Sequence, residues 1–110
     1  MKLPKSFVYM HHPFKIIEGD VDESNLAENE HKFLWGAVRW AEGSIVVNPN
    51  LSPHLRKTVL AHELWHVAID KCGIALDTEG KETLVDLLSH CMVEMFASNP
   101  WFGEYFHDHS

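Results

Sequence analysis

Two histidines and a glutamate lie close together near the middle of this sequence, in the order His62-Glu63-Leu64-Trp65-His66. On an α-helix, residues four apart lie on the same face, one turn from each other. His62 and His66 could then share one zinc ion, which takes imidazole nitrogens at about 2.0–2.1 Å. Glu63 would project beside them, where its carboxylate could hold a water on the metal and accept its proton. The pattern therefore predicts a hydrolytic metal site.

A plainer interpretation is a surface helix that carries two solvated histidines. The chain has nine histidines, which raises the rate of chance matches. The surrounding residues argue against this interpretation, because His62 and His66 share one helical stripe with Leu55, Val59 and Ile69. Histidines on a partly buried face need either partners in the core or a bound metal.

The helix that carries the motif is expected to run from about Pro53 to Lys71. Ser52 is a good N-cap, and Pro53 suits the first helical position. Gly73 follows the last turn, where a left-handed residue commonly ends a helix. The motif is thus predicted to lie inside a well-bounded helix of about five turns.

A catalytic zinc ion needs a third protein ligand, and a second helix predicted at about 79–98 offers three candidates. These are Glu82, Glu79 and His90, of which Glu82 is the preferred one. Asp86 lies four residues after Glu82 and shares its face. There it could accept the N–H on the far side of a ligating histidine and fix its tautomer. Favourable placement of acids at a helix N-terminus would explain Glu79 and Glu82, but not Asp86, which lies among leucines and a valine.

The segments before the motif helix read as strands. Residues 7–17 are apolar but interrupted by Pro13, which predicts two strand pieces or one bent strand. Residues 31–40 and 44–48 are predicted to form a β-hairpin around Glu42-Gly43, with its first strand at an edge. An extended peptide could pair with that edge, although an edge without a partner is equally compatible with the sequence. The acidic segment 20–30 is expected to be a solvated loop or the start of a short helix. His11 and His12 are expected to be polar surface residues. The aromatic tail, residues 101–110, is expected to fold back on the domain.

Residues 33–98 resemble the zincin metallopeptidases, through a strand ending in Ile45-Val46-Val47-Asn48 and the helix Thr58-Val59-Leu60-Ala61-His62-Glu63-Leu64-Trp65-His66. The acid pair on the following helix is similar to that of the gluzincins, and the small size resembles minimal ImmA/IrrE-type and phage-encoded relatives. The resemblance implies an α+β fold with a small, mostly antiparallel sheet packed on the motif helix and a second C-terminal helix. The metzincin branch requires a glycine and a third histidine soon after the motif. This chain has Ile69 and Cys72 at those positions, which excludes that branch.

Carried over to this sequence, the resemblance implies that His62, His66 and Glu82 bind Zn²⁺, with Glu63 as general base and Asp86 as partner of a ligand. It implies hydrolysis of a peptide or protein substrate. The larger gluzincins also use a histidine or tyrosine to stabilise the oxyanion. The candidates here are three tail residues and one residue of the motif helix, namely Tyr105, His107, His109 and His54.

Length and composition predict one soluble domain over residues 1–110. The net charge of −7 and the lack of a basic run argue against nucleic-acid binding. We expect no signal peptide and no membrane span, and hence a cytoplasmic protein. Cys72 and Cys91 are expected to be reduced thiols, with one bridge between the two helices as the alternative.

Two other functions fit the same residues. The domain could be a metal-stabilised regulatory or interaction module without useful turnover, since no oxyanion donor is assigned. It could also be a structural protein without metal, in which case substitution of His62 would barely change its stability. The sequence leaves the substrate, the physiological metal and the oligomeric state open.

Overall fold

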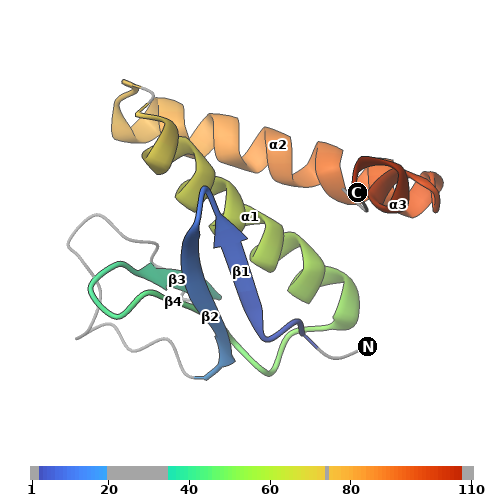
Figure 1. Ribbon diagram of the computed structural model, residues 1–110, viewed down its shortest axis with the longest axis horizontal. Coiled ribbons are helices and arrows are strands. Elements are labelled where there is room, and N and C mark those ends of the chain that lie inside the picture. Colours follow the sequence, from blue (N-terminus) through green and yellow to red (C-terminus); the bar gives the residue numbers. More distant parts are fainter. Residues whose placement is uncertain (1–2, 20–34, 74, 108–110) are drawn as a thin grey trace.

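A mixed four-stranded sheet and three helices form the part of the chain that the computed structural model describes, which is residues 3–19, 35–73 and 75–107 (Figure 1). The predicted α+β class is therefore confirmed. The strands lie in the order β1-β2-β4-β3. The elements, in chain order, are β1 (Ser6–Tyr9), β2 (His12–Glu18), β3 (Gly36–Arg39), β4 (Ser44–Val47), α1 (Pro53–Cys72), α2 (Thr78–Ser98) and α3 (Phe102–Phe106).

The first two strands form an antiparallel hairpin whose turn is Met10-His11, with φ angles of 48° and 70°. The expectation of two strand pieces is correct, but the prediction that Pro13 interrupts them is wrong. The backbone N–H of Lys15 donates to Gly43 O, on the β4 side of β2. Residues two apart in a strand direct their N–H groups to the same side, so the N–H that Pro13 lacks would also face β4. The pairing of β2 with β4 begins only at Lys15 and Ser44, so Pro13 removes no hydrogen bond from it.

The predicted second hairpin is present, with β3 antiparallel to β4 and a turn closed by a hydrogen bond from Gly43 N to Trp40 O. All four residues of β4 are buried, because β4 lies between β2 and β3. Within the described residues β3 is an edge strand, as predicted. Residues 31–34 of the predicted strand and the acidic segment 20–30 lie outside the described residues.

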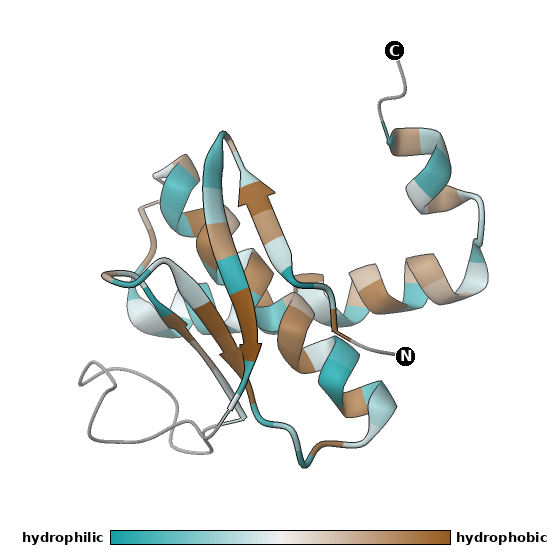
Figure 2. Ribbon diagram, turned by 60° about the horizontal axis from the view of Figure 1, so that its bottom comes forward, coloured by the Kyte–Doolittle hydropathy of each residue, from teal (hydrophilic) through white to brown (hydrophobic). Residues whose placement is uncertain are grey.

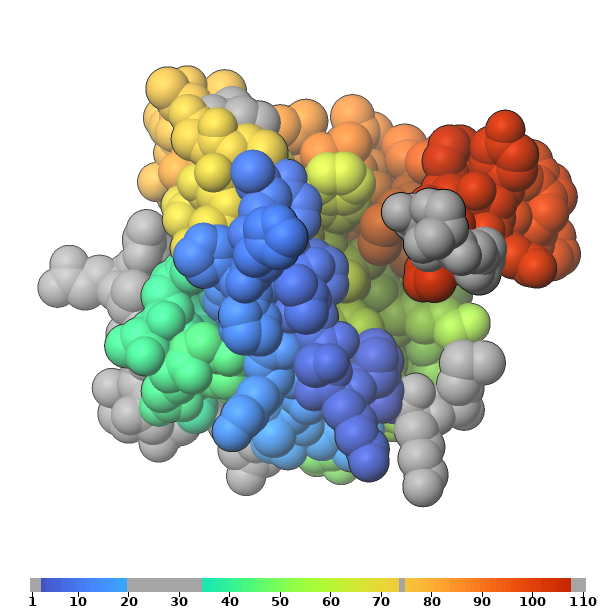
Figure 3. Space-filling model, in the orientation of Figure 1, coloured from blue at the N-terminus to red at the C-terminus, as the bar shows by residue number. Residues whose placement is uncertain are grey.

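Helix α1 is the central element, since it packs against β3, β4 and α2 (Figure 1). The core joins the inner faces of the sheet and α1, and its buried cluster consists of Phe14, Val38, Ile45, Val47, Val59 and Val67. Apolar residues accordingly follow the central strands and alternate with polar ones along α1 (Figure 2). The space-filling view shows β1 and β2 lying over α1 (Figure 3).

The helix boundaries follow from the caps that the sequence contains. The Ser52 side chain accepts a hydrogen bond from Leu55 N, and Gly73 ends α1 in the left-handed conformation with φ 69°. Asp77 caps α2 by accepting from Gly80 N at 2.7 Å. Both helices therefore lie within one residue of their predicted bounds.

The aromatic tail forms the short helix α3, which stands beyond the C-terminal end of α2 (Figure 2). Its contact with α2 includes the rings of Phe96 and Phe102, whose centroids are 5.0 Å apart. No residue of α3 is buried. For residues 101–107, the expectation that the tail folds back on the domain is therefore wrong beyond this contact, because α2 extends past the sheet and offers α3 only its own end. Residues 108–110 of the predicted tail lie outside the described residues.

Neither cysteine forms a disulfide, as expected, and both side chains are exposed. Cys72 Sγ lies 3.0 Å from the hydroxyl of Tyr9, which ties the end of α1 to β1. This hydrogen bond, together with desolvation and the charge of the thiolate, raises the pKa of Tyr9 above its usual value. Among the described helices, none is long and apolar enough to cross a membrane.

Candidate metal centre

The two histidines of the motif meet on α1. Their Nε2 atoms are 3.1 Å apart, as the spacing of one helical turn allows. Both side chains are half-buried, with exposed fractions of 14% for His62 and 24% for His66. This placement agrees with the predicted stripe and differs from a pair of solvated surface histidines.

Glu82 of α2 completes the group. Its Oε1 lies 3.0 Å from His66 Nε2, and its Oε2 lies 3.4 Å from His62 Nε2. Helix α2 presents this side because its two buried residues, Val85 and Ser89, lie three and seven positions after Glu82 and share its face. The preferred candidate for the third position is thus the carboxylate that reaches the histidines.

The other two candidates lie elsewhere on α2. Glu79 and His90 are exposed, and neither belongs to the group. Across residues 3–19, 35–73 and 75–107, His62, His66 and Glu82 form the single set of three potential metal ligands with converging donor atoms, all within 4.8 Å of one another. The pair His11 and His12 is exposed at the β1–β2 turn, as expected for surface polar residues.

The donor set fits a zinc ion in type and in spacing. Zinc in proteins prefers imidazole nitrogen and carboxylate oxygen at about 2.0–2.2 Å, and tetrahedral ligands at that radius lie roughly 3.3 Å from one another. The two histidine Nε2 atoms are 3.1 Å apart, close to this edge length, and each lies 3.0–3.4 Å from a different carboxylate oxygen of Glu82. Three protein ligands would leave a fourth position for a water or substrate.

Asp86 lies on the opposite side of the His62 ring. Its Oδ1 is 3.0 Å from His62 Nδ1, within hydrogen-bonding distance. If Nδ1 donates to this carboxylate, Nε2 carries the lone pair that a metal needs. This is the position expected for Asp86 from its spacing with Glu82. The Asp86 side chain is 63% exposed, which makes the contact weaker than a buried one would be.

Glu63 is buried, with an exposed fraction of 4%, between α1 and the edge strand β3. A Cβ placed on Gly36 would lie 3.2 Å from Glu63 Cγ and 2.7 Å from Val59 Cγ1. Only a residue without a side chain lets β3 approach α1 this closely. Sequence reasoning missed the role of Gly36, although a glycine among the bulky residues of a predicted strand is a signal of close backbone approach.

The candidates for an oxyanion donor do not join this group. His54 lies eight residues before His62 on the same helix, about 12 Å along its axis. Tyr105 and His107 belong to or follow α3, and the stretch of α2 between Glu82 and Ser98 is about 24 Å long. His109 lies outside the described residues.

Comparisons with family models, with curated proteins and with solved structures find no match to this chain. The functional interpretation therefore depends on the geometry of the site.

Proposed function

We propose that this chain is a zinc-dependent peptidase with a minimal zincin-like domain of the gluzincin type, similar to ImmA/IrrE-type enzymes. The observation that carries the proposal is the convergence of His62, His66 and Glu82 from two helices. Two further features support it, namely Asp86 at the far nitrogen of His62 and the burial of Glu63, which follows His62 in the sequence.

His62, His66 and Glu82 would hold the metal, through two imidazole nitrogens and a carboxylate. Zinc in this position would polarise the peptide carbonyl and acidify a bound water. Glu63 would accept the proton of the attacking water on its carboxylate and pass it to the nitrogen of the leaving amine. Asp86 would hold the proton on His62 Nδ1 and orient the ring.

The substrate would be a peptide or protein segment in an extended conformation that pairs with β3. Two observations support this position. Strand β3 is an edge of the sheet within the described residues, and one side of its backbone pairs with no other strand among them. It also approaches α1 at Glu63 through Gly36, which would bring a paired peptide close to the general base.

The test is cleavage of a peptide library by the zinc-loaded protein, with products read by mass spectrometry. The proposal predicts cleavage that a chelator abolishes and that added zinc restores. Absence of cleavage by protein shown to contain zinc would contradict the peptidase function while leaving the metal site intact.

That last outcome would favour a second candidate function, a metal-binding regulatory or interaction module without turnover. The observation in its favour is the distance of His54, Tyr105 and His107 from the metal ligands. Under either function we place the protein in the cytoplasm, which the two free, exposed thiols support.

A further inference from the structure

The apolar core of this chain does not extend to the two C-terminal helices. Its buried cluster, and the half-buried side chains packed against that cluster, all come from residues 3–67, which include the four strands and most of α1. Among the described residues, no side chain of α2 or α3 belongs to it. The last residue of α1 is fastened to the sheet as well, because Cys72 Sγ lies 3.0 Å from the hydroxyl of Tyr9 on β1. The sheet and α1 therefore form one packed unit.

Helix α2 is attached to this unit mainly through its contact with α1. Of its 21 residues only Val85 and Ser89 are buried, and the apolar residues next to them, Leu88, Met92 and Val93, are half-buried. Helix α3 packs against α2 and has no buried residue of its own. Because the gain from packing grows with the apolar area removed from water, α2 and α3 are held less firmly than the strands are.

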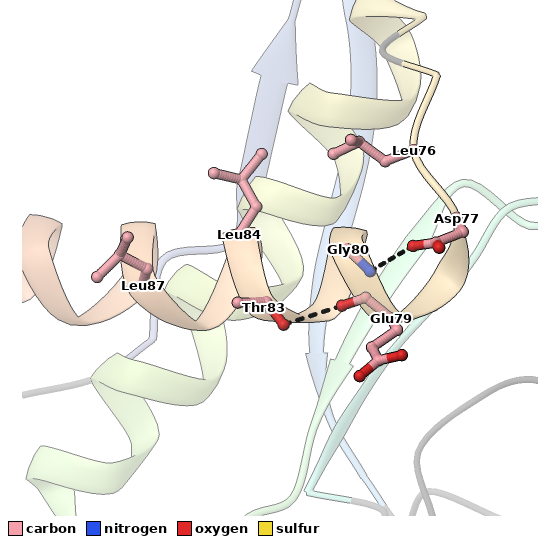
Figure 4. A pocket seen from close by; sticks show the side chains of 7 residues that line it. All are labelled: Leu76, Asp77, Glu79, Gly80, Thr83, Leu84 and Leu87. Atoms are coloured by element: carbon pink, nitrogen blue, oxygen red, sulfur yellow. Dashed lines mark hydrogen bonds between the residues drawn. The ribbon is translucent and has the colours of Figure 1, made fainter.

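The N-terminal end of α2 adds little apolar packing to this attachment. Leu84 and Leu87 line a pocket that is open to solvent, and Leu87 is 60% exposed. Figure 4 shows both side chains on one side of the helix. The hydrogen bond at the start of α2, from Gly80 N to the Asp77 side chain, caps the helix and does not reach α1. At this end the attachment therefore depends largely on polar contacts with α1.

Those polar contacts belong to the candidate metal centre. Glu82 lies 3.0 Å from His66 Nε2 and 3.4 Å from His62 Nε2, and Asp86 lies 3.0 Å from His62 Nδ1. The Oε2 atom of Glu82 is shielded from solvent. Removing a carboxylate oxygen from water costs free energy that neutral imidazoles offset only in part, whereas a bound divalent cation would offset it well. A metal ion would thus turn a costly position for Glu82 into a bond between α1 and α2.

We propose that α2 and α3 open away from the sheet and α1 as one unit, and that metal bound by His62, His66 and Glu82 controls how often they do so. A metal that binds only while the helices are together favours the closed form, by one plus the ratio of free metal to its dissociation constant. Opening separates Glu82 from the two histidines, so it is also the step through which the site loads and loses its metal. This inference rests on the metal centre of the proposed function, but not on peptide cleavage.

Hydrogen exchange of the full chain, read for each amide, tests the proposal, since it detects openings that occur in a small fraction of molecules. In the presence of a chelator, the slowest amides of α2 should exchange faster than the slowest amides of β4, because α2 opens while the sheet stays folded. Free zinc at roughly 100 times its dissociation constant should slow exchange in α2 about 100-fold. Equal protection of α2 and β4 in the chelator, or exchange in α2 that bound zinc does not slow, would overturn the proposal.

A buried thiol in each part of the molecule gives an independent readout of opening. Ser89→Cys places a thiol of similar size at a buried position of α2, and Val47→Cys places one in the core on β4. Both are made with Cys72→Ser and Cys91→Ser, which remove the exposed natural thiols. In the chelator, N-ethylmaleimide should modify position 89 faster than position 47, and zinc should slow the reaction at position 89. A reaction at position 89 no faster than at position 47 would contradict the proposal.

Glu82→Gln shows whether the metal acts through the residue that joins the two helices. Combined with Ser89→Cys, it should abolish the effect of zinc on labelling, whereas the matched control Glu79→Gln should retain it. Elemental analysis of the same samples separates the possible failures. Protein that contains one zinc per chain but labels equally with and without it would overturn this inference alone. Protein whose labelling responds to zinc but which cleaves no peptide would support this inference and contradict the peptidase function.

Discussion

Asp86 Oδ1 lies 3.0 Å from His62 Nδ1, on the ring edge opposite the Nε2 atom that approaches His66 and Glu82. One imidazole thus connects a carboxylate on one side with the converging donor atoms on the other. The contact joins α1 to α2, and it gives Asp86 a purpose that helix capping does not explain. The pair supports the proposal that His62, His66 and Glu82 bind a metal.

Removal of the Asp86 carboxylate should weaken zinc binding without abolishing it. We expect Asp86→Ala to raise the zinc dissociation constant about tenfold, the low end of the range for such partners, because Asp86 is largely exposed. Competition with a chelating dye measures this constant. Glu79→Ala is the matched control, as an exposed acid on the same helix outside the group. Equal affinity in wild type and Asp86→Ala would show that Asp86 does not position His62.

Replacement of Glu63 should separate metal binding from catalysis. Glu63→Gln keeps the volume of this buried side chain but cannot accept a proton, so peptide cleavage should fall by about 10²–10⁴-fold. Zinc content and melting temperature should stay near those of wild type. The assay is cleavage of a peptide selected from the library, with Glu79→Gln as control. Wild-type turnover by Glu63→Gln would show that another group is the general base.

A side chain at Gly36 should push β3 away from the motif helix. In Gly36→Ala the new methyl group would lie 2.7 Å from Val59 Cγ1, so we expect a loss of about 1–3 kcal/mol in the free energy of unfolding. Urea denaturation measures the loss. Gly19→Ala is the control, since its methyl group would make an ordinary 3.7 Å contact with Val46.

Shortening Val59 tests the cause of that loss. If the clash with Val59 is responsible, Gly36→Ala should cost less in a Val59→Ala background than in wild type. An equal cost in the two backgrounds would assign the effect to the neighbouring Val46 O or Glu63 Cγ instead, each 3.2 Å from the added atom.

Much of the helical part could be predicted, because its signals are local. The side chains of Ser52 and Asp77 cap the N-termini of α1 and α2, and Gly73 ends α1 in the left-handed conformation. The observed helices begin and end within one residue of these signals. The meeting of His62 with His66 depends only on helical spacing. The approach of Glu82 to the two histidines depends on the packing of α2 against α1. The apolar stripes on both helices favoured that packing.

The sheet was harder to predict because its pairing is not local. Strand β2 pairs parallel to β4 across a long separation in the sequence, and nothing near either strand specifies that partner. Pro13 suggested a break because proline has no backbone N–H to donate to a neighbouring strand. The pairing of β2 with β4 starts only after Pro13, at Lys15, so the strand continues through it. The close approach of Gly36 to α1 and the position of α3 at the end of α2 both depend on how distant elements pack. The local sequence around these residues carries no information on that packing.

The central claim is that His62, His66 and Glu82 bind one metal ion, and elemental analysis of protein purified after zinc supplementation tests it most directly. We predict about one zinc per chain in wild type and in Glu79→Ala, and nearly none in His62→Ala and Glu82→Ala. Circular dichroism of each variant checks that the fold persists. No zinc in the wild type, or full occupancy in both ligand variants, would contradict the account.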